Sequence, residues 1–266
     1  MGNKDHPAAE RELRLLAPGE PQPFCILNKS AETPLLLLCD HASRRIPESL
    51  GNLGLDPVAL RCHLAWDIGA GPMTTSLASS LGATAVLAGY SRLVVDCNRQ
   101  LLDPQAFLEY GDGVVVSGNR GISDADRRVR TEEIYWPYHG AIAGQITRLQ
   151  NAGQMPIVLA IHSFTPVMNS VSRPWEVGIL WDKDPRVPGI LIDELRRAGL
   201  IVGDNEPYSG RAPQDFTIDH HAEAAGLPHA GIEIRQDLVS DEYGVQKMAE
   251  VFNGILTSLP ERIRNT

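Results

Sequence analysis

Three short apolar runs and one apolar residue along the chain lead into side chains that are common in enzyme sites. The runs at 35–38, 93–95 and 157–161 and the apolar residue 232 lead, in that order, into Asp40-His41, Asp96-Cys97-Asn98-Arg99, His162-Ser163 and Glu233-Ile234-Arg235. Continuous apolar runs of this kind are typical of strands buried on both faces of a parallel sheet. Ligands of open α/β sheets bind at the carboxyl ends of such strands, so we expect these side chains to converge on one crevice.

The same pattern predicts strands that alternate with helices. Strands are predicted at 35–39, 83–87, 93–96, 157–161, 177–181 and 230–234, and helices at 57–65, 71–81, 132–150, 187–198, 216–225 and 243–259. This alternation indicates one α/β domain over residues 21–266, with a mostly parallel (mixed) central sheet and helices on both faces. Residues 1–20 are interpreted as an N-terminal surface arm.

Composition narrows the class of protein. Of the 266 residues 43% are hydrophobic and 21% are charged, as in ordinary soluble globular proteins, and no apolar stretch is long enough to cross a membrane. The formal net charge of -9 gives no bulk attraction to nucleic acid or to an anionic membrane, so we expect neither partner. The four cysteines form no CxxC pair and the N-terminal segment lacks a signal-peptide core, which favours a cytoplasmic protein.

Three residues are candidates to hold a metal ion. His41 and His162 follow buried runs, and a neutral imidazole is the commonest metal ligand in proteins. The alternative for His41 is a hydrogen-bonded histidine in a tight turn, whereas His162 needs some polar partner because burying an unpaired polar group is costly. Asp67 precedes a glycine, and its alternative role is to cap the next helix.

Other residues of the same segments suggest acid–base chemistry and substrate binding. Glu233 and Arg235 have the spacing that places side chains on one face of a strand, and a glutamate beside a metal can act as general base. The alternative is a Glu–Arg ion pair on an edge strand. Arg99 and Arg92 could bind an acidic substrate through bidentate contacts, although an internal ion pair with Asp96 is the favoured interpretation for Arg92.

Weaker signals come from the region 205–221. The turn Asn205-Glu206-Pro207-Tyr208-Ser209-Gly210 is rich in hydrogen-bonding groups and could line a pocket, although proline and glycine mark turns in any case. Adjacent helical residues face different ways, so at most one of His220 and His221 should enter the site, and we select His221. The chain contains no GxGxxG, P-loop, HExxH or GxSxG motif, which counts against the common nucleotide, zincin and serine-hydrolase chemistries.

These segments follow one another in an order that resembles the N-formylglutamate amidohydrolase family. The resemblance extends from about residue 35 to residue 237. The similar segments are Asp40-His41, Asp67-Ile68-Gly69, Ser91-Arg92-Leu93-Val94-Val95-Asp96-Cys97-Asn98-Arg99, His162-Ser163, the 205–210 turn and Glu233-Ile234-Arg235. The resemblance implies a single α/β domain of the zinc-exopeptidase (phosphorylase/hydrolase-like) type. It also implies hydrolysis of N-formyl-L-glutamate to formate and glutamate, a step of histidine catabolism.

Carried onto this chain, the resemblance makes His41 and His162 metal ligands and Glu233 the catalytic carboxylate. Asn98 and Arg99 resemble the Asn-Arg pair with which carboxypeptidase relatives bind a substrate carboxylate. Those relatives take another ligand from a glutamate three residues after the first histidine, where this chain has arginine. We therefore expect Asp67 to replace that ligand.

Together these observations predict an amidohydrolase that acts on a small acidic N-acyl amino acid with one divalent metal ion, Zn²⁺ being the expected ion. The metal would lower the pKa of a water molecule, Glu233 would move the proton, and Arg235 could stabilise the developing oxyanion. Asn98, Arg99, Arg92, Asn205, Tyr208, Ser209 and His221 are the candidates for substrate binding. Alternatives are the same type of hydrolase acting on another acyl-amino acid or an acidic peptide, and a non-catalytic protein that binds carboxylate ligands. The sequence leaves the oligomeric state open.

Overall fold

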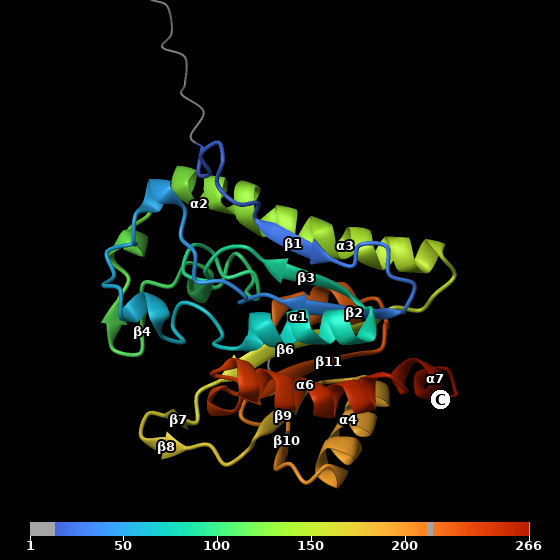
Figure 1. Ribbon diagram of the computed structural model, residues 1–266. Coiled ribbons are helices and arrows are strands. Elements are labelled where there is room, and N and C mark those ends of the chain that lie inside the picture. Colours follow the sequence, from blue (N-terminus) through green and yellow to red (C-terminus); the bar gives the residue numbers. More distant parts are fainter. Residues whose placement is uncertain (1–13, 212–214, 266) are drawn as a thin grey trace, which may run out of the picture.

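A mixed seven-stranded sheet lies at the centre of the protein. The structure is a computed structural model that describes residues 14–211 and 215–265. Within these residues the strand order of the large sheet is β1-β3-β2-β6-β11-β9-β10 (Figure 1). Its strands are β1 (Phe24–Leu27), β2 (Leu35–Cys39), β3 (Thr84–Ala88), β6 (Ile157–Phe164), β9 (Val177–Leu180), β10 (Val202–Asp204) and β11 (His229–Arg235).

Most neighbouring strands of this sheet run parallel. The pairs β3-β2, β2-β6, β6-β11 and β9-β10 are parallel, whereas β1-β3 and β11-β9 are antiparallel. The expected mostly parallel, mixed sheet is therefore confirmed. Two antiparallel hairpins lie outside it, β4 (Tyr110–Gly111) with β5 (Val114–Val115) and β7 (Val167–Met168) with β8 (Val171–Ser172).

Helices cover both faces of the sheet, as predicted. They are α1 (Ala70–Leu81), α2 (Asp124–Arg130), α3 (Trp136–Asn151), α4 (Arg186–Arg197), α5 (Phe216–Ile218), α6 (Glu242–Leu256) and α7 (Leu259–Arg264). Figure 1 shows α3 along one side of the sheet and α1, α4, α6 and α7 on the other.

Strand β2 shows how the sequence produces these two layers. Its alternate side chains enter different cores, because successive strand residues point to opposite faces. Leu35 and Leu37 pack with apolar residues of α1, α4, α6 and α7, whereas Leu36 and Leu38 pack with residues of α3. The continuous apolar run therefore reflects burial on both faces.

Two predicted elements are corrected by the structure. Residues 93–96 form a turn and an irregular segment instead of a strand, and their side chains separate, with Leu93 in one small cluster and Val94 and Val95 in another. The 57–65 segment contains only a single 3-10 turn, Ala59–Arg61. The N-cap of this turn is Val58 instead of Asp56, although Asp56 Oδ1 accepts hydrogen bonds from the backbone N–H groups of residues 58 and 59, both at 2.8 Å.

The helix predicted at 132–150 starts differently from the expectation. A π-helical turn, Thr131–Tyr135, joins α2 to α3, and Pro137 lies in the first turn of α3. Proline has no backbone N–H, so the regular hydrogen-bond ladder is interrupted at this point. Likewise, only Phe216–Ile218 of the predicted 216–225 helix is α-helical, and a π-helical turn, Asp219–Glu223, follows it.

The expected N-terminal arm lies largely outside the described residues, which start at 14. The described end of that arm is attached to the domain, because the backbone N–H groups of Leu15 and Leu16 donate to the Glu133 carboxylate at 2.8 and 2.9 Å. Within the described ranges, each helix is too short or too polar to cross a bilayer.

Candidate active site

The carboxyl ends of three adjacent parallel strands bring the predicted chemistry together. His41 lies two residues beyond the end of β2, and His162 lies within β6, which runs three residues further than predicted. Glu233 lies on β11 directly opposite His162 in the register of the parallel pair. Both side chains therefore project from the same face of the sheet.

Asp67 reaches the same place from the loop that precedes α1. Its backbone N–H donates to the His41 carbonyl at 3.0 Å, which ties the loop to the end of β2. The helix cap is Gly69 at φ +83, and the Asp67 side chain makes no capping bond, so the capping alternative is wrong. Gly69 packs so tightly against Val239 that a Cβ there would overlap the valine backbone and side chain. The Asp-Ile-Gly segment therefore needs glycine both for its backbone conformation and for its packing.

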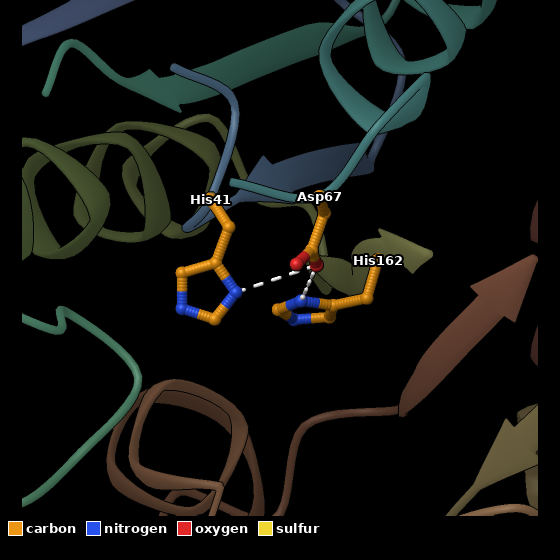
Figure 2. A group of neighbouring side chains, drawn as sticks. All are labelled: His41, Asp67 and His162. Carbon is orange, nitrogen blue, oxygen red and sulfur yellow. Dashed lines mark hydrogen bonds and ion pairs between the residues drawn. The ribbon is translucent and has the colours of Figure 1, made fainter. Parts of the chain in front are cut away.

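Figure 2 shows both imidazoles facing one carboxylate. The Nδ1 atoms of His41 and His162 lie 3.3 and 2.9 Å from Asp67 Oδ2. One potential ligand atom from each of these three buried residues lies within 4.8 Å of the other two. Two imidazole nitrogens and one carboxylate oxygen form a donor set that suits Zn²⁺ and similar divalent ions.

Each histidine also faces a second buried carboxylate with its other ring nitrogen. His41 Nε2 lies 2.8 Å from Asp96 Oδ1, and His162 Nε2 lies 3.2 Å from Asp40 Oδ2. Asp40 is held in turn by the Thr217 hydroxyl, which donates to its Oδ1 at 2.7 Å. Outer carboxylates of this kind fix the ring orientation of histidines that bind metals. The two histidines are thus held between buried carboxylates, an arrangement compatible both with metal ligands and with the hydrogen-bonded alternative given for His41.

The charges of this cluster depend on one another. Burial by itself would raise the pKa of the Asp67 carboxyl, but the charge of His41 and the hydrogen bond from His162 lower it below the ordinary range. Burial by itself would lower the pKa of His162, but hydrogen bonds to Asp40 and Asp67 raise it well above the usual value. Without a cation, protonated imidazoles therefore balance the buried carboxylates, and a cation bound at the same place would supply that positive charge.

The pKa of Glu233 is shifted in the opposite direction from that of Asp67. Burial, with the charges of Asp67 and Asp215 adding to it, raises the pKa of Glu233 to about 8 against the opposing effect of His162. Its Oε2 atom is buried and has no hydrogen-bond partner among the described residues. A carboxyl group with a pKa close to neutrality is suited to accepting and returning a proton.

These residues open into a cavity of about 480 Å³. Its walls come from the strand ends, from the β4–β5 hairpin, from the start of the β7–β8 hairpin and from the 208–209 turn. The lining residues are His41, His63, Leu64, Asp67, Arg92, Asp96, Asn98, Arg99, Gln105, Leu108, Gly111, Asp112, His162, Ser163, Met168, Tyr208, Ser209, Asp215 and Glu233. The cavity is large enough for a small amino acid derivative.

Asn98 and Arg99 lie together in the wall of this cavity, as predicted, and both face the carboxylate of Asp215. Asn98 Nδ2 donates to Asp215 Oδ1 at 3.1 Å, and Arg99 Nη1 lies 3.7 Å from the same oxygen. Asn98 is oriented by its own Oδ1, which accepts the backbone N–H of Thr217 at 3.0 Å. The pair is thus arranged around one carboxylate that belongs to the protein.

Arg92 lines the cavity and makes the ion pair that its sequence position suggested. Its Nη2 and Nε atoms lie 2.6 and 2.9 Å from Asp96 Oδ2, and its Nη1 lies 3.7 Å from Asp67 Oδ1. Burial by itself would raise the pKa of Asp96. Nearby positive charges, of which that of Arg92 has the largest effect, hold this pKa well below its ordinary value. Arg92 therefore contributes to the charged network around His41 whether or not it contacts a ligand.

Some residues of the 205–210 turn line the cavity, whereas others stabilise the turn itself. Tyr208 and Ser209 line the cavity, as predicted. Asn205 is not among the lining residues, and its Oδ1 accepts the backbone N–H groups of Trp181 and Gly210, both at 3.0 Å. The Asn205 side chain therefore holds the shape of the turn.

Two further candidates do not reach the cavity. Arg235 ends β11 and binds Asp237 at 2.8 Å and the carbonyl oxygens of Pro174 and Trp175 at 3.2 and 3.3 Å. His221 is buried against His139, with His139 Nδ1 and His221 Nε2 at 2.9 Å. Neither residue belongs to the cavity lining, so the structure brings neither to the strand-end cluster.

Several cavity residues are not among those expected from the sequence. His63 Nε2 lies 2.8 Å from Asp112 Oδ2 at the wall, where the segment before α1 meets the β4–β5 turn. Asp215 is another such residue. These side chains lie on irregular segments whose position depends on the tertiary fold, so no periodicity in the sequence marks them.

The chain is similar to a protein-family model and to a curated protein. A family model described as N-formylglutamate amidohydrolase matches residues 33–240. N-formylglutamate deformylase of Pseudomonas putida is 27% identical over 146 residues, which cover 49% of this chain and 51% of the deformylase. The chain thus aligns with about half the length of this curated relative.

Two solved structures resemble this one over nearly all of the chain. Gene product Atu2144 from Agrobacterium tumefaciens is 34% identical and has a TM-score of 0.91, with 94% of this chain and 100% of that chain covered. N-formylglutamate amidohydrolase from Ralstonia eutropha JMP134 has a TM-score of 0.74 at 18% identity, with 92% and 99% covered. The second similarity is one of fold, and it supports the predicted α/β class.

Proposed function

The chain belongs to the N-formylglutamate amidohydrolase family, and from this premise we propose that it is a metal-dependent amidohydrolase. The proposed substrate is a small N-acyl amino acid, with N-formyl-L-glutamate as the first candidate, cleaved to formate and glutamate. The proposal depends most on one observation: the Asp67, His41 and His162 ligand atoms and the buried Glu233 carboxyl line the same cavity. His41, Asp67 and His162 would hold the metal.

When bound, a divalent ion such as Zn²⁺ supplies a Lewis acid that activates water and polarises the amide carbonyl. The chain itself provides the proton transfer. Glu233, with a pKa raised to about 8 in the absence of a cation, would take a proton from the attacking water and return it to the leaving amine. Its lack of a hydrogen-bond partner leaves the carboxyl available for this task.

The remaining cavity residues would bind and orient the substrate. Asn98 and Arg99 already contact one carboxylate, that of Asp215, and would hold the α-carboxylate of the substrate in the same way. Arg92 would place positive charge near the scissile carbonyl oxygen. We assign it this role in place of Arg235, because Arg92 lines the cavity and is fixed by Asp96.

Release of formate from N-formyl-L-glutamate tests the proposal. We expect turnover by protein supplied with Zn²⁺, loss of turnover with a chelator, and recovery when metal is added back. Glu233→Gln should lower kcat by about 10²- to 10⁴-fold, the range usual for loss of a general base. The matched control is Glu223→Gln, which changes a glutamate outside the cavity lining and should retain wild-type turnover. Equal activity of Glu233→Gln and wild type would contradict the role of Glu233.

A further inference from the structure

One arginine beside the cavity has no carboxylate partner within residues 14–211 and 215–265. Arg173 follows β8 and is half-buried. Its guanidinium donates to the Tyr208 hydroxyl at 3.0 Å and to Thr165 Oγ1 at 3.5 Å, and it lies 2.6 Å from Met168 Sδ. All of these partners are neutral, so no carboxylate of the described residues neutralises the Arg173 charge.

The two arginines of the cavity wall differ from Arg173 in this respect. Arg92 is paired with Asp96, and Arg99 lies 3.7 Å from Asp215. The positive charge of a half-buried guanidinium is only partly neutralised by neutral acceptors and aromatic rings. The guanidinium can therefore still attract an anion that enters the cavity.

Tyr208 connects Arg173 with the cavity. The Arg173 guanidinium lies 4.9 Å above the Tyr208 ring, and Tyr208 itself lines the cavity, as Met168 does. The tyrosine oxygen accepts the bond from Arg173, so its own proton is left for another acceptor, and no residue in the described ranges takes it. Burial and then the charge of Glu233 raise the pKa of the Tyr208 hydroxyl, which keeps it protonated as a donor.

We propose that Tyr208 and Arg173 form a second anion subsite, which selects substrates that carry an acidic side chain. The Tyr208 hydroxyl donates to the side-chain carboxylate of the substrate, and Arg173 supplies the compensating charge from behind it, with Asn98 and Arg99 binding the α-carboxylate at the other position. This inference rests on the proposed function, because it names the substrate class of the same cavity. It makes Arg173 a determinant of specificity that acts through charge and through Tyr208.

A matched pair of substrates isolates this subsite. N-formyl-L-glutamate and N-formyl-L-glutamine have nearly the same size but differ by one negative charge. We expect Arg173→Met to lower kcat/KM for the glutamate derivative by about 10- to 100-fold, mainly through KM, and to change the glutamine derivative by less than about threefold. Tyr208→Phe should shift the preference in the same direction by a smaller factor.

Arg127→Met is the control for removing a stacked arginine. Arg127 is also half-buried and lies 4.8 Å above the ring of Phe107, but it does not line the cavity. We expect it to leave the ratio of the two kcat/KM values unchanged. An equal loss for both substrates in Arg173→Met, or no loss for either, would overturn the subsite.

Direct binding separates this inference from the proposed function. If the wild type hydrolyses neither derivative, the proposed function fails, and calorimetric titration with glutarate and with its monoamide still tests the subsite. Tighter binding of glutarate than of the monoamide, with the difference abolished by Arg173→Met, supports the subsite. Equal affinities of the wild type for the two ligands would overturn it.

Discussion

At the scale of single residues, Asp215 already faces Asn98 and Arg99, the two side chains proposed to bind the substrate carboxylate. Its carboxylate accepts from Asn98 and lies near Arg99, so an incoming carboxylate meets both a like charge and donors that are already in use. On the proposed function, Asp215 keeps the two donors ordered in the free protein and competes with the ligand.

Replacing Asp215 with asparagine should remove this competition. Asp215→Asn keeps the shape of the side chain but removes its charge, so we expect KM for an N-acyl amino acid to fall by roughly 3- to 10-fold with little change in kcat. Initial-rate kinetics measure this, with Asp219→Asn, a carboxylate outside the cavity lining, as the control. A rise in KM would mean that the Asp215 charge serves to orient Asn98 and Arg99.

Glu233 should make the metal-free protein less stable as the pH rises. In the unfolded chain its pKa is near 4.5, whereas in the fold burial raises it to about 8. Between these values the unfolded state loses the proton and the folded state keeps it, so the free energy of unfolding falls with increasing pH. We expect wild type to lose roughly 2–4 kcal/mol relative to Glu233→Gln between pH 5 and pH 8.

Urea unfolding of metal-free wild type and Glu233→Gln at several pH values measures that difference. Asp67, His41 and His162 are common to both proteins, so the comparison largely cancels their titration. A pH-independent difference in stability would show that the Glu233 carboxyl has an ordinary pKa in the fold.

Among the site residues, the sequence predicted best those that lie on or just after central strands. His41, His162 and Glu233 follow apolar runs that are strands in the structure. Arg235 was misplaced because β11 ends there and its side chain turns to Asp237, where the alternation of the strand no longer determines direction. His221 was misplaced because it lies in a π-helical turn packed on His139.

At the scale of elements, the loop that precedes α1 contains a position near the site that requires glycine. It presents Asp67 to both histidines and then turns at Gly69 with φ +83 against Val239. A side chain at this position would move the loop and with it the Asp67 carboxylate.

Gly69→Ala should therefore destabilise the protein and weaken metal binding. Its counterpart Gly82→Ala is a matched control, because Gly82 ends the same helix at φ +58 with open space around its Cβ position. Both variants incur the backbone cost of about 1 kcal/mol, but only Gly69→Ala adds an overlap, for which we expect at least about 2 kcal/mol more. Thermal unfolding and metal titration of the two variants measure this, and equal behaviour would contradict the role assigned to Gly69.

The elements that escaped prediction have a common physical origin. The β4–β5 and β7–β8 hairpins have two-residue strands, too short to show alternation. The buried residues 93–95 form a turn and the start of an irregular segment, and their side chains enter two separate cores. The apolar run 93–95 therefore correctly predicted that these residues are buried. Tertiary packing, and not the local sequence, determined the backbone conformation of this run.

At the scale of the whole molecule, the site exists because the sheet brings distant segments together. The Thr217 hydroxyl bonds to Asp40 across 177 residues of sequence, and His162 and Asp67 are 95 residues apart. The sequence predicted an α/β sheet with convergent strand ends, but not that β2, β6 and β11 are neighbours or that β11 and β9 are antiparallel. Strand order depends on which crossovers the chain makes, and local patterns carry no such information.

The metal content of purified protein tests the central claim most directly. Wild type, His162→Ala and His229→Ala are purified without added metal or chelator and analysed by elemental mass spectrometry. His229 is a buried histidine at the opposite end of the same sheet, paired in register with Val158, and serves as the control. We predict about one equivalent of a divalent metal in wild type and in His229→Ala, and loss of that metal in folded His162→Ala. Retention of a full equivalent by His162→Ala would contradict the assignment of His41, Asp67 and His162 as the metal site.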